Sequence, residues 1–129
     1  MSTLKRYRSR SQNFVVAVQF NLDIPEFTYN KWGAEQRCKR GDWLVDNDGD
    51  VYSVDREVFA RTYRLRSPGV YVKSSRVWGE VAGQDGSIAT KEGRSHYEKG
   101  DYLVYNNEDR SDGYAMSASK FASLYELDE

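Results

Sequence analysis

A seven-residue motif that occurs twice constrains the fold of this chain more than any other feature. Residues 41–47 read Gly-Asp-Trp-Leu-Val-Asp-Asn and residues 100–106 read Gly-Asp-Tyr-Leu-Val-Tyr-Asn, so five of the seven positions are identical. Four further pairs of like residues lie 62 positions apart, namely Tyr52 and Tyr114, Phe59 and Phe121, Ala60 and Ala122, and Tyr63 and Tyr125. Because order, spacing and residue type agree, the sequence indicates a degenerate tandem duplication.

Both copies predict the same strands. An extended apolar or alternating segment opens each copy, at 14–20 and at 70–77. The strand that starts at the Gly-Asp step is followed by a polar turn and by a short return strand, at 51–54 or 113–116. A β-hairpin is the expected connection, since the Asn, Asp and Gly residues of the turn tolerate positive φ.

A short helix is expected after each hairpin. Asp55 and Ser117 are placed to accept hydrogen bonds from the first free N–H groups of these helices. A hairpin alone is marginal in water, and two copies side by side could complete one sheet and one core, although the sequence leaves open whether the sheet is shared. We therefore expect a small α+β fold, mainly antiparallel β with two short helices. Its two pseudo-symmetric repeats, 12–66 and 67–129, would pack as one compact domain.

Charge is spread unevenly along the chain. The net charge is −1, with +3 in residues 1–66 and −4 in residues 67–129, so the folded part lacks the basic excess of a dedicated nucleic-acid domain. Much of the positive charge lies in an arm, residues 1–11, at Lys5, Arg6, Arg8 and Arg10. We expect this arm to be flexible, as chain termini often are. The alternative is that it contacts nucleic-acid phosphates, with Tyr7 free to stack on a base.

The single cysteine, Cys38, excludes an intramolecular disulfide and a zinc site with several cysteines. A cytosolic compartment is the simplest expectation. No apolar segment follows the basic residues of the N-terminus, which argues against a secretory signal. The longest apolar run, 14–18, is too short to span a membrane, and no membrane partner is expected.

The second copy carries motifs in an order that resembles a known family. Thr-x-Glu-Gly at 90–93 is followed by Gly-Asp-Tyr at 100–102, by Tyr114, and by Phe121 with Tyr125. This order resembles the small Pro-Gly-Asp-Tyr-type proteins of bacterial and phage genomes. The resemblance implies an origin in a bacterial or phage-infected cell.

The match to this family has two departures. The Pro that precedes the Gly is replaced by Arg40 in copy one and by Lys99 in copy two, and the Thr-x-Glu-Gly element is not evident in copy one. The resemblance supports the repeat and implies no reaction, cofactor or catalytic residue.

The doubled Gly-Asp-aromatic step has two interpretations. In the first, Gly supplies an unusual φ, Asp bonds nearby N–H groups, and the aromatic residue begins a strand. In the second, Asp42 and Asp101 together with Trp43 and Tyr102 bind a partner or a flat polar ligand by stacking and hydrogen bonding. The turn interpretation is favoured on turn chemistry alone.

Three further patterns invite a chemical assignment. The acidic run 46–50 matches the start of a calcium loop, but Val51 stands where the EF-hand turn requires Gly, so an acidic hairpin turn is favoured. The Ser-x-x-Lys string at 117–120 matches serine acyl-enzymes, which need a larger scaffold, so a helix cap is favoured. Cys38 and His96 could form a catalytic pair, but copy two has Tyr at the position of Cys38. We assign no catalytic, cofactor-binding or metal-binding residue.

The sequence therefore predicts a non-enzymatic binding or interaction protein that recognises a protein partner or a small ligand at the two hairpins or between them. Two alternatives stay open. One is a minor structural or assembly protein of the virion type. The other is a nucleic-acid or nucleotide binder that uses the arm and stacked aromatic residues.

Overall fold

The computed structural model describes residues 4–10 and 13–128 of the chain. The fold is rich in antiparallel β-structure with two short helices, as predicted, and two five-stranded sheets dominate it. In spatial order, the first sheet contains β6 (Asp50–Val54), β5 (Trp43–Asn47), β2 (Val15–Gln19), β8 (Val70–Lys73) and β7 (Tyr63–Ser67). The second contains β13 (Gly113–Met116), β12 (Tyr102–Tyr105), β9 (Val77–Val81), β1 (Lys5–Ser9) and β14 (Tyr125–Leu127). The described residues therefore form two separate five-stranded sheets rather than one shared sheet.

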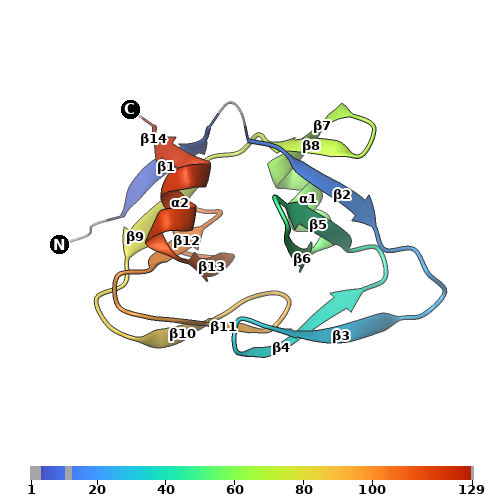
Figure 1. The fold of residues 1–129 in the computed structure, drawn as a ribbon, viewed down its shortest axis with the longest axis horizontal. Helices are drawn as coiled ribbons and strands as arrows, with labels where there is room; N and C mark the ends of the chain where they lie inside the picture. The colour runs from blue at the N-terminus through green and yellow to red at the C-terminus, as the bar shows by residue number, and fades with distance from the viewer. Residues whose placement is uncertain (1–3, 11–12, 129) are drawn as a thin grey trace.

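Two further hairpins and two helices complete the described chain. The hairpins are β3 (Glu26–Lys31) with β4 (Ala34–Lys39), and β10 (Gly86–Ala89) with β11 (Arg94–Tyr97), and the helices are α1 (Arg56–Thr62) and α2 (Ala118–Leu124). Figure 1 shows the two sheets side by side, with a helix on each and both hairpins along the lower edge. The hairpins meet there, since the N–H of His96 donates to the carbonyl of Trp32 at 3.1 Å and that of Arg37 to the carbonyl of Glu92 at 2.8 Å.

Each helix begins at the capping residue that the sequence predicted. The carboxylate of Asp55 accepts from the N–H groups of Glu57 and Val58 at 3.0 and 3.2 Å. The hydroxyl of Ser117 accepts from the N–H of Lys120 at 3.2 Å. Both helices end after seven residues, where the chain extends into β7 or β14.

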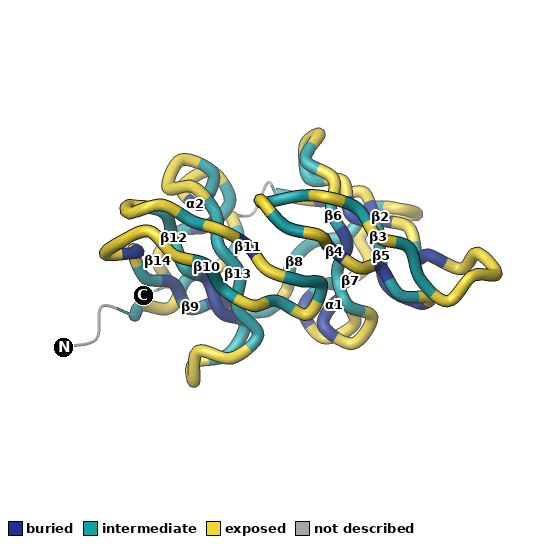
Figure 2. Tube along the Cα trace, turned by 90° about the horizontal axis from the view of Figure 1, so that it is seen from below, coloured by how far each residue is buried: buried dark blue, intermediate teal, exposed yellow. Residues whose placement is uncertain are grey.

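Each sheet packs its helix through stacked aromatic rings. In the first half, Phe59 of α1 stacks on Trp43 with ring centroids 4.2 Å apart. In the second half, Phe121 of α2 stacks on Tyr102 at 4.0 Å. Both Phe rings are 3% exposed and belong to separate clusters of buried residues, one under each sheet. The aromatic residues of the doubled motif thus pack, partly buried, against the core of each half. Figure 2 shows the buried segments inside each half with exposed turns around them.

Strands β1, β8 and β9 differ from the expected organisation. Lys5–Ser9, expected in the flexible arm, form β1 between β9 and β14, while residues 1–3 and 11 of that arm lie outside the described residues. The segment 70–77, expected as one strand of the second half, is divided. Residues up to Lys73 form β8 in the first sheet, and Val77 begins β9 in the second.

Side-chain alternation explains why the first segment forms a strand. Tyr7 points inward, and its ring lies edge-on to Phe121 at 4.7 Å. Arg6 and Arg8 flank it and both pair with Asp128 near the other end of the chain. No local pattern predicts this strand, because its partners β9 and β14 lie far along the chain.

Candidate functional site

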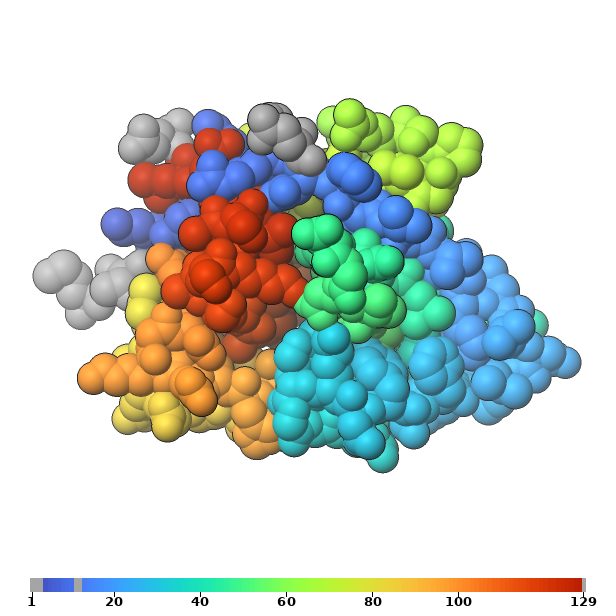
Figure 3. Space-filling model, in the orientation of Figure 1, coloured from blue at the N-terminus to red at the C-terminus, as the bar shows by residue number. Residues whose placement is uncertain are grey.

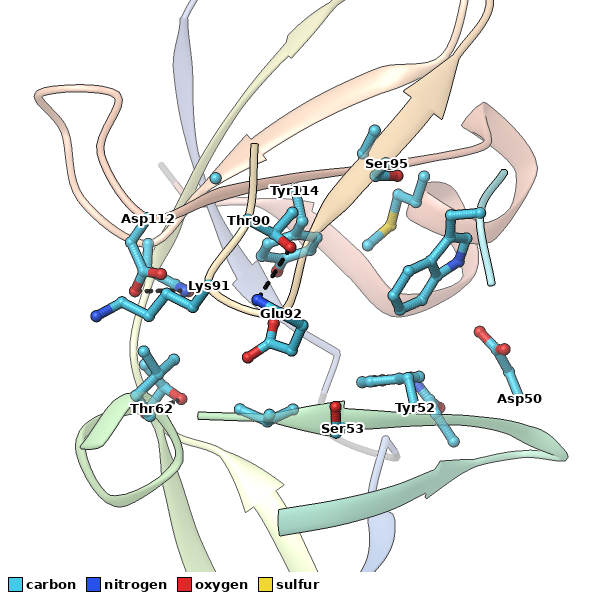
Figure 4. Close-up of a pocket in the computed structure, with 18 of the residues that line it drawn as sticks. Asp50, Tyr52, Ser53, Thr62, Thr90, Lys91, Glu92, Ser95, Asp112 and Tyr114 are labelled. Carbon is cyan, nitrogen blue, oxygen red and sulfur yellow. Dashed lines mark hydrogen bonds between the residues drawn. The ribbon is translucent and has the colours of Figure 1, made fainter. Parts of the chain in front are cut away.

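A cavity of about 400 Å³ lies between the two halves. Its walls come from β6, β13, both helices and the β10–β11 hairpin, so that neither half forms it alone. Figure 4 shows Tyr52, Ser53 and Thr62 on one side, with Tyr114, Ser95 and Glu92 facing them. Figure 3 shows the halves in contact above the hairpins, where Lys120 of α2 pairs with Asp50 of β6. The cavity is the feature around which we build the candidate site.

Four tyrosines that the sequence recognised as repeated pairs line this cavity: Tyr52, Tyr63, Tyr114 and Tyr125. The hydroxyl groups of Tyr114 and Tyr125 lie 3.2 Å apart, in hydrogen-bond contact. Burial raises the pKa of all four phenols above the ordinary value. They therefore remain neutral at physiological pH and offer O–H donors beside apolar rings.

Lys73 lies among these rings. Its Nζ donates to the hydroxyl of Tyr114 at 3.0 Å and sits 5.3–5.8 Å from the ring centroids of Tyr63, Tyr114 and Tyr125. These are cation–π distances. No carboxylate of the described residues lies within ion-pair distance of this ammonium group. Lys73 thus supplies a positive charge to the cavity wall without a counter-ion.

Glu92 supplies a carboxyl group from the turn between β10 and β11. Burial raises its pKa to about 7; the ammonium of Lys39 opposes the shift and the carboxylates of Asp42 and Asp55 add to it. Its Oε2 atom is buried and has no hydrogen-bond partner among the described residues. A second buried acceptor without a partner, Oδ1 of Asn106, belongs to another residue of the cavity lining.

The turn that carries Glu92 is held firmly. The hydroxyl of Thr90 accepts from the N–H groups of Glu92 and Gly93 at 3.3 and 3.0 Å. A Cβ on Gly93 would lie 2.3 Å from the carbonyl oxygen of Glu35, so only glycine allows this close approach of the hairpins. The Thr-x-Glu-Gly element therefore fixes the position of the carboxyl group beside the cavity.

The doubled Gly-Asp step forms a turn in both halves. Gly41 and Gly100 have φ values of 97° and 95°, and in each case the following Asp accepts from the N–H three residues before it, at 2.9 Å. Asp42 is 2% exposed and also accepts from the Nζ of Lys39 at 3.2 Å and from the N–H of Arg56 at 3.1 Å. These contacts satisfy both carboxylate oxygens of Asp42 and join the turn to the start of α1.

The structure separates the four residues that the sequence proposed for partner binding. Asp101 contributes to the cavity lining, whereas Asp42, Trp43 and Tyr102 are absent from it. Trp43 and Tyr102 use one face of their rings in the helix stacks. A role for these four residues in partner binding stays a prediction, and the repeated tyrosines downstream of the motif line the cavity instead.

The cations of the expected arm have partners within the protein. Nε of Arg6 lies 2.9 Å from Oδ2 of Asp128, Arg8 pairs with the same carboxylate, and Nε of Arg10 donates to the carbonyl of Ala122 at 2.9 Å. Lys5 is exposed in β1. A role for these four residues in phosphate contact stays a prediction.

The other sequence patterns are explained by local structure. Asp46 closes the β5–β6 turn by accepting from the N–H of Gly49 at 2.8 Å, and Asp50 pairs with Lys31. Burial raises the pKa of the Cys38 thiol to about 11, and Cys38 lies outside the cavity lining to which His96 contributes. Within the described residues no group of three or more His, Cys, Asp or Glu side chains is arranged to hold a metal ion.

Sequence reasoning missed Lys73, Glu92 and Asn106 as members of one site. Glu92 was visible as part of the Thr-x-Glu-Gly element, but Lys73 belongs to no motif.

Across residues 4–10 and 13–128, no helix has the length and apolar character needed to cross a membrane. Comparisons with protein-family models, with curated proteins and with solved structures found no match to this chain.

Proposed function

We propose that this protein binds a small organic molecule in the cavity between its two sheets. The observation that carries the proposal is the cavity itself. Its volume of about 400 Å³ falls within the range of about 300–1,000 Å³ that ligand pockets occupy. Its lining combines aromatic rings with polar and charged side chains that could orient a ligand.

A binding role without catalysis agrees with the contacts of the lining hydroxyl groups. Ser53 is bonded to the hydroxyl of Tyr29 at 2.6 Å, and Thr62 donates to the carbonyl of Val58 at 2.7 Å. Thr90 holds its own turn. These hydroxyls serve the fold, and none of them is bonded to a general base in the way that an activated nucleophile requires.

We further propose that the cavity arose where two copies of one module meet. The two sheets have the same order when β8 is matched with β1, and the two helices follow equivalent strands. The same backbone contacts recur, since Phe20 and Ala82 donate to the carbonyl groups of Asp42 and Asp101 at 2.7 Å. Under this proposal each copy lends its first strand to the sheet of the other copy and contributes two tyrosines to the shared cavity.

A fragment screen by protein-observed NMR tests the proposed function. Bound fragments should shift the amide resonances of residues that line the cavity, such as Tyr114 and Ser53. Met116→Trp narrows the cavity and should abolish these shifts, whereas Leu127→Trp adds the same ring at an exposed strand end outside the lining and should preserve them. Fragments that bind equally well to both variants, or that shift only residues elsewhere, would contradict the proposal.

A further inference from the structure

We infer that the ligand is a small zwitterion, an amine joined to a carboxylate by a short apolar or aromatic body. Glu92 would hold the amine and Lys73 the carboxylate. The inference rests on the proposed function, because it assigns the chemistry of the same cavity.

The first argument is that two charged groups of opposite sign in the lining lack counter-ions. Lys73 donates to a phenol hydroxyl and faces three aromatic rings, but no ion pair involves it. Glu92 has a buried oxygen without a partner and no cation within ion-pair distance among the described residues. No ion pair joins the two groups to each other. A molecule that carries both charges would complete both contacts, and buried charges in native proteins are normally paired.

The second argument concerns the surroundings of each charged group. Near Glu92 the carboxylates of Asp42 and Asp55 already pair with the ammonium of Lys39. The Oε2 atom of Glu92, which has no partner in the described part of the chain, is therefore the acceptor that an amine with its several N–H donors would reach. Around Lys73 the neighbouring groups are phenols, which donate hydrogen bonds and do not compete for the ammonium as a carboxylate would. A carboxylate is the acceptor that suits this ammonium group.

The third argument concerns the body of the ligand. The rings of Tyr52, Tyr63, Tyr114 and Tyr125 line the same cavity, together with Met116. Aromatic and thioether side chains favour contact with apolar or planar groups. A strongly hydrated ligand such as an inorganic ion would leave these surfaces uncovered.

A panel of matched probes tests the inference on the unmodified chain. The zwitterions are γ-aminobutyrate, ε-aminocaproate and p-(aminomethyl)benzoate, and each is compared by calorimetry or NMR with the amine and with the carboxylate that lack its second charge. At least one zwitterion should bind about tenfold or more tightly than both of its singly charged analogues, since a charge-assisted hydrogen bond is lost in each. If an analogue binds as tightly as its zwitterion in every series, the inference is overturned while the binding function stands.

Two substitutions separate the roles of the charged groups. Glu92→Gln should lower the affinity for zwitterions and amines but leave the affinity for carboxylates unchanged. Lys73→Met should lower the affinity for zwitterions and carboxylates but leave the affinity for amines unchanged. Glu98→Gln and Lys99→Met change like charges at exposed positions outside the lining and serve as controls. Equal effects of both substitutions on all probes would overturn the assignment.

The pH dependence of binding provides a second readout. Raising the pH from 6 to 8 ionises Glu92, so zwitterion affinity should rise about tenfold. The charged groups around Glu92 are Lys39, Asp42 and Asp55 from the first half and Lys91 beside it, and His96 of β11 also lines the cavity. Glu92→Gln should remove the pH dependence, and an undiminished dependence in this variant would contradict the role of Glu92. If no molecule of any class occupies the cavity, it is the proposed function that fails.

Discussion

The two sheets are closed at the same edge by different parts of the chain. In the first sheet β7 and β8 are neighbours in sequence, joined by a turn at Pro68 and Gly69. In the second sheet the corresponding pair is β14 and β1, the last and first strands of the chain. The same packing thus follows from a local connection in one half and from a contact across the whole chain in the other.

The comparison shows what a closing strand must supply. Tyr71 of β8 lies edge-on to Phe59 with centroids 5.0 Å apart, and Tyr7 of β1 lies edge-on to Phe121 at 4.7 Å. Each of these strands contributes one inward tyrosine to the aromatic cluster of its half. The segments that carry these tyrosines otherwise differ in sequence, so packing against the helix determines where each strand lies.

Removal of the central ring of each cluster should have the largest effect. Phe59→Ala and Phe121→Ala should each lower the free energy of unfolding by about 3–5 kcal/mol, since both rings are buried and contact three other rings. Urea unfolding followed by fluorescence measures the loss. Equal losses would support equivalent halves, and a loss in only one variant would show that the halves do not form equivalent cores.

The two hairpin turns differ in a way that makes stability depend on pH. The turn of β10–β11 brings Glu92 to the cavity, whereas the turn of β3–β4 places Trp32 there. Because the folded pKa of Glu92 is raised to about 7, the folded state keeps its proton while the unfolded state has lost it. Stability from this group is therefore greatest below the unfolded pKa and declines as the pH rises towards 7.

The substitution Glu92→Gln isolates this dependence. The difference in the free energy of unfolding between the variant and the native chain should increase by about 2–3 kcal/mol in favour of the variant as the pH rises from 5 to 8, as expected for a pKa shift of this size. Denaturant unfolding at both values measures the difference, with Glu98→Gln as the exposed control. A constant difference between native chain and variant across this range would contradict the burial of the carboxyl group.

Parts of the fold were predictable because their causes are local. The turns of β5–β6 and β12–β13, the helix caps at Asp55 and Ser117, and the shared face of Phe and Tyr in each helix depend on residues within a few positions of one another. The position of β1 depends on Tyr7 meeting a helix more than a hundred residues away, and no local pattern encodes that. Likewise, β8 and β9 read as one extended segment until tertiary pairing divides them.

The site was predictable to a smaller extent for the same reason. The repeated tyrosines were visible in the sequence, but their position at one cavity depends on how the halves pack. Lys73 and Glu92 become notable only because neither has a counter-ion, and that property belongs to the folded chain. The Gly-Asp-aromatic motif was the strongest repeat because it forms the same turn twice, and a strong repeat marks a structural need as readily as a binding site.

The two Asp residues of that motif should contribute unequally to stability. Asp42→Ala removes a buried carboxylate with three hydrogen bonds and should cost about 2–3 kcal/mol. Asp101→Ala removes one hydrogen bond at a half-buried position and should cost about 1 kcal/mol. Chemical unfolding of the two variants compares them directly. Equal costs would mean that the contacts of Asp42 to Lys39 and Arg56 add nothing to the turn.

The smallest effect is expected at the ion pairs that hold the chain's two ends together. Asp128 accepts from Arg6, Arg8 and Arg76, so Asp128→Asn should weaken the pairing of β1 with β14 slightly. Exposed ion pairs contribute little and are screened by salt, so the difference between variant and native chain should shrink in 1 M salt. Hydrogen exchange of the β1 amides measures it, with those of β8 as the internal control. A covalent turn joins β8 to its neighbour β7, whereas β1 is held by charge and packing. If Asp128→Asn makes amide exchange faster in β1 alone, the ion pairs compensate for the missing connection. If the exchange of β1 and β8 stays equally slow, the packing of Tyr7 is sufficient to hold β1.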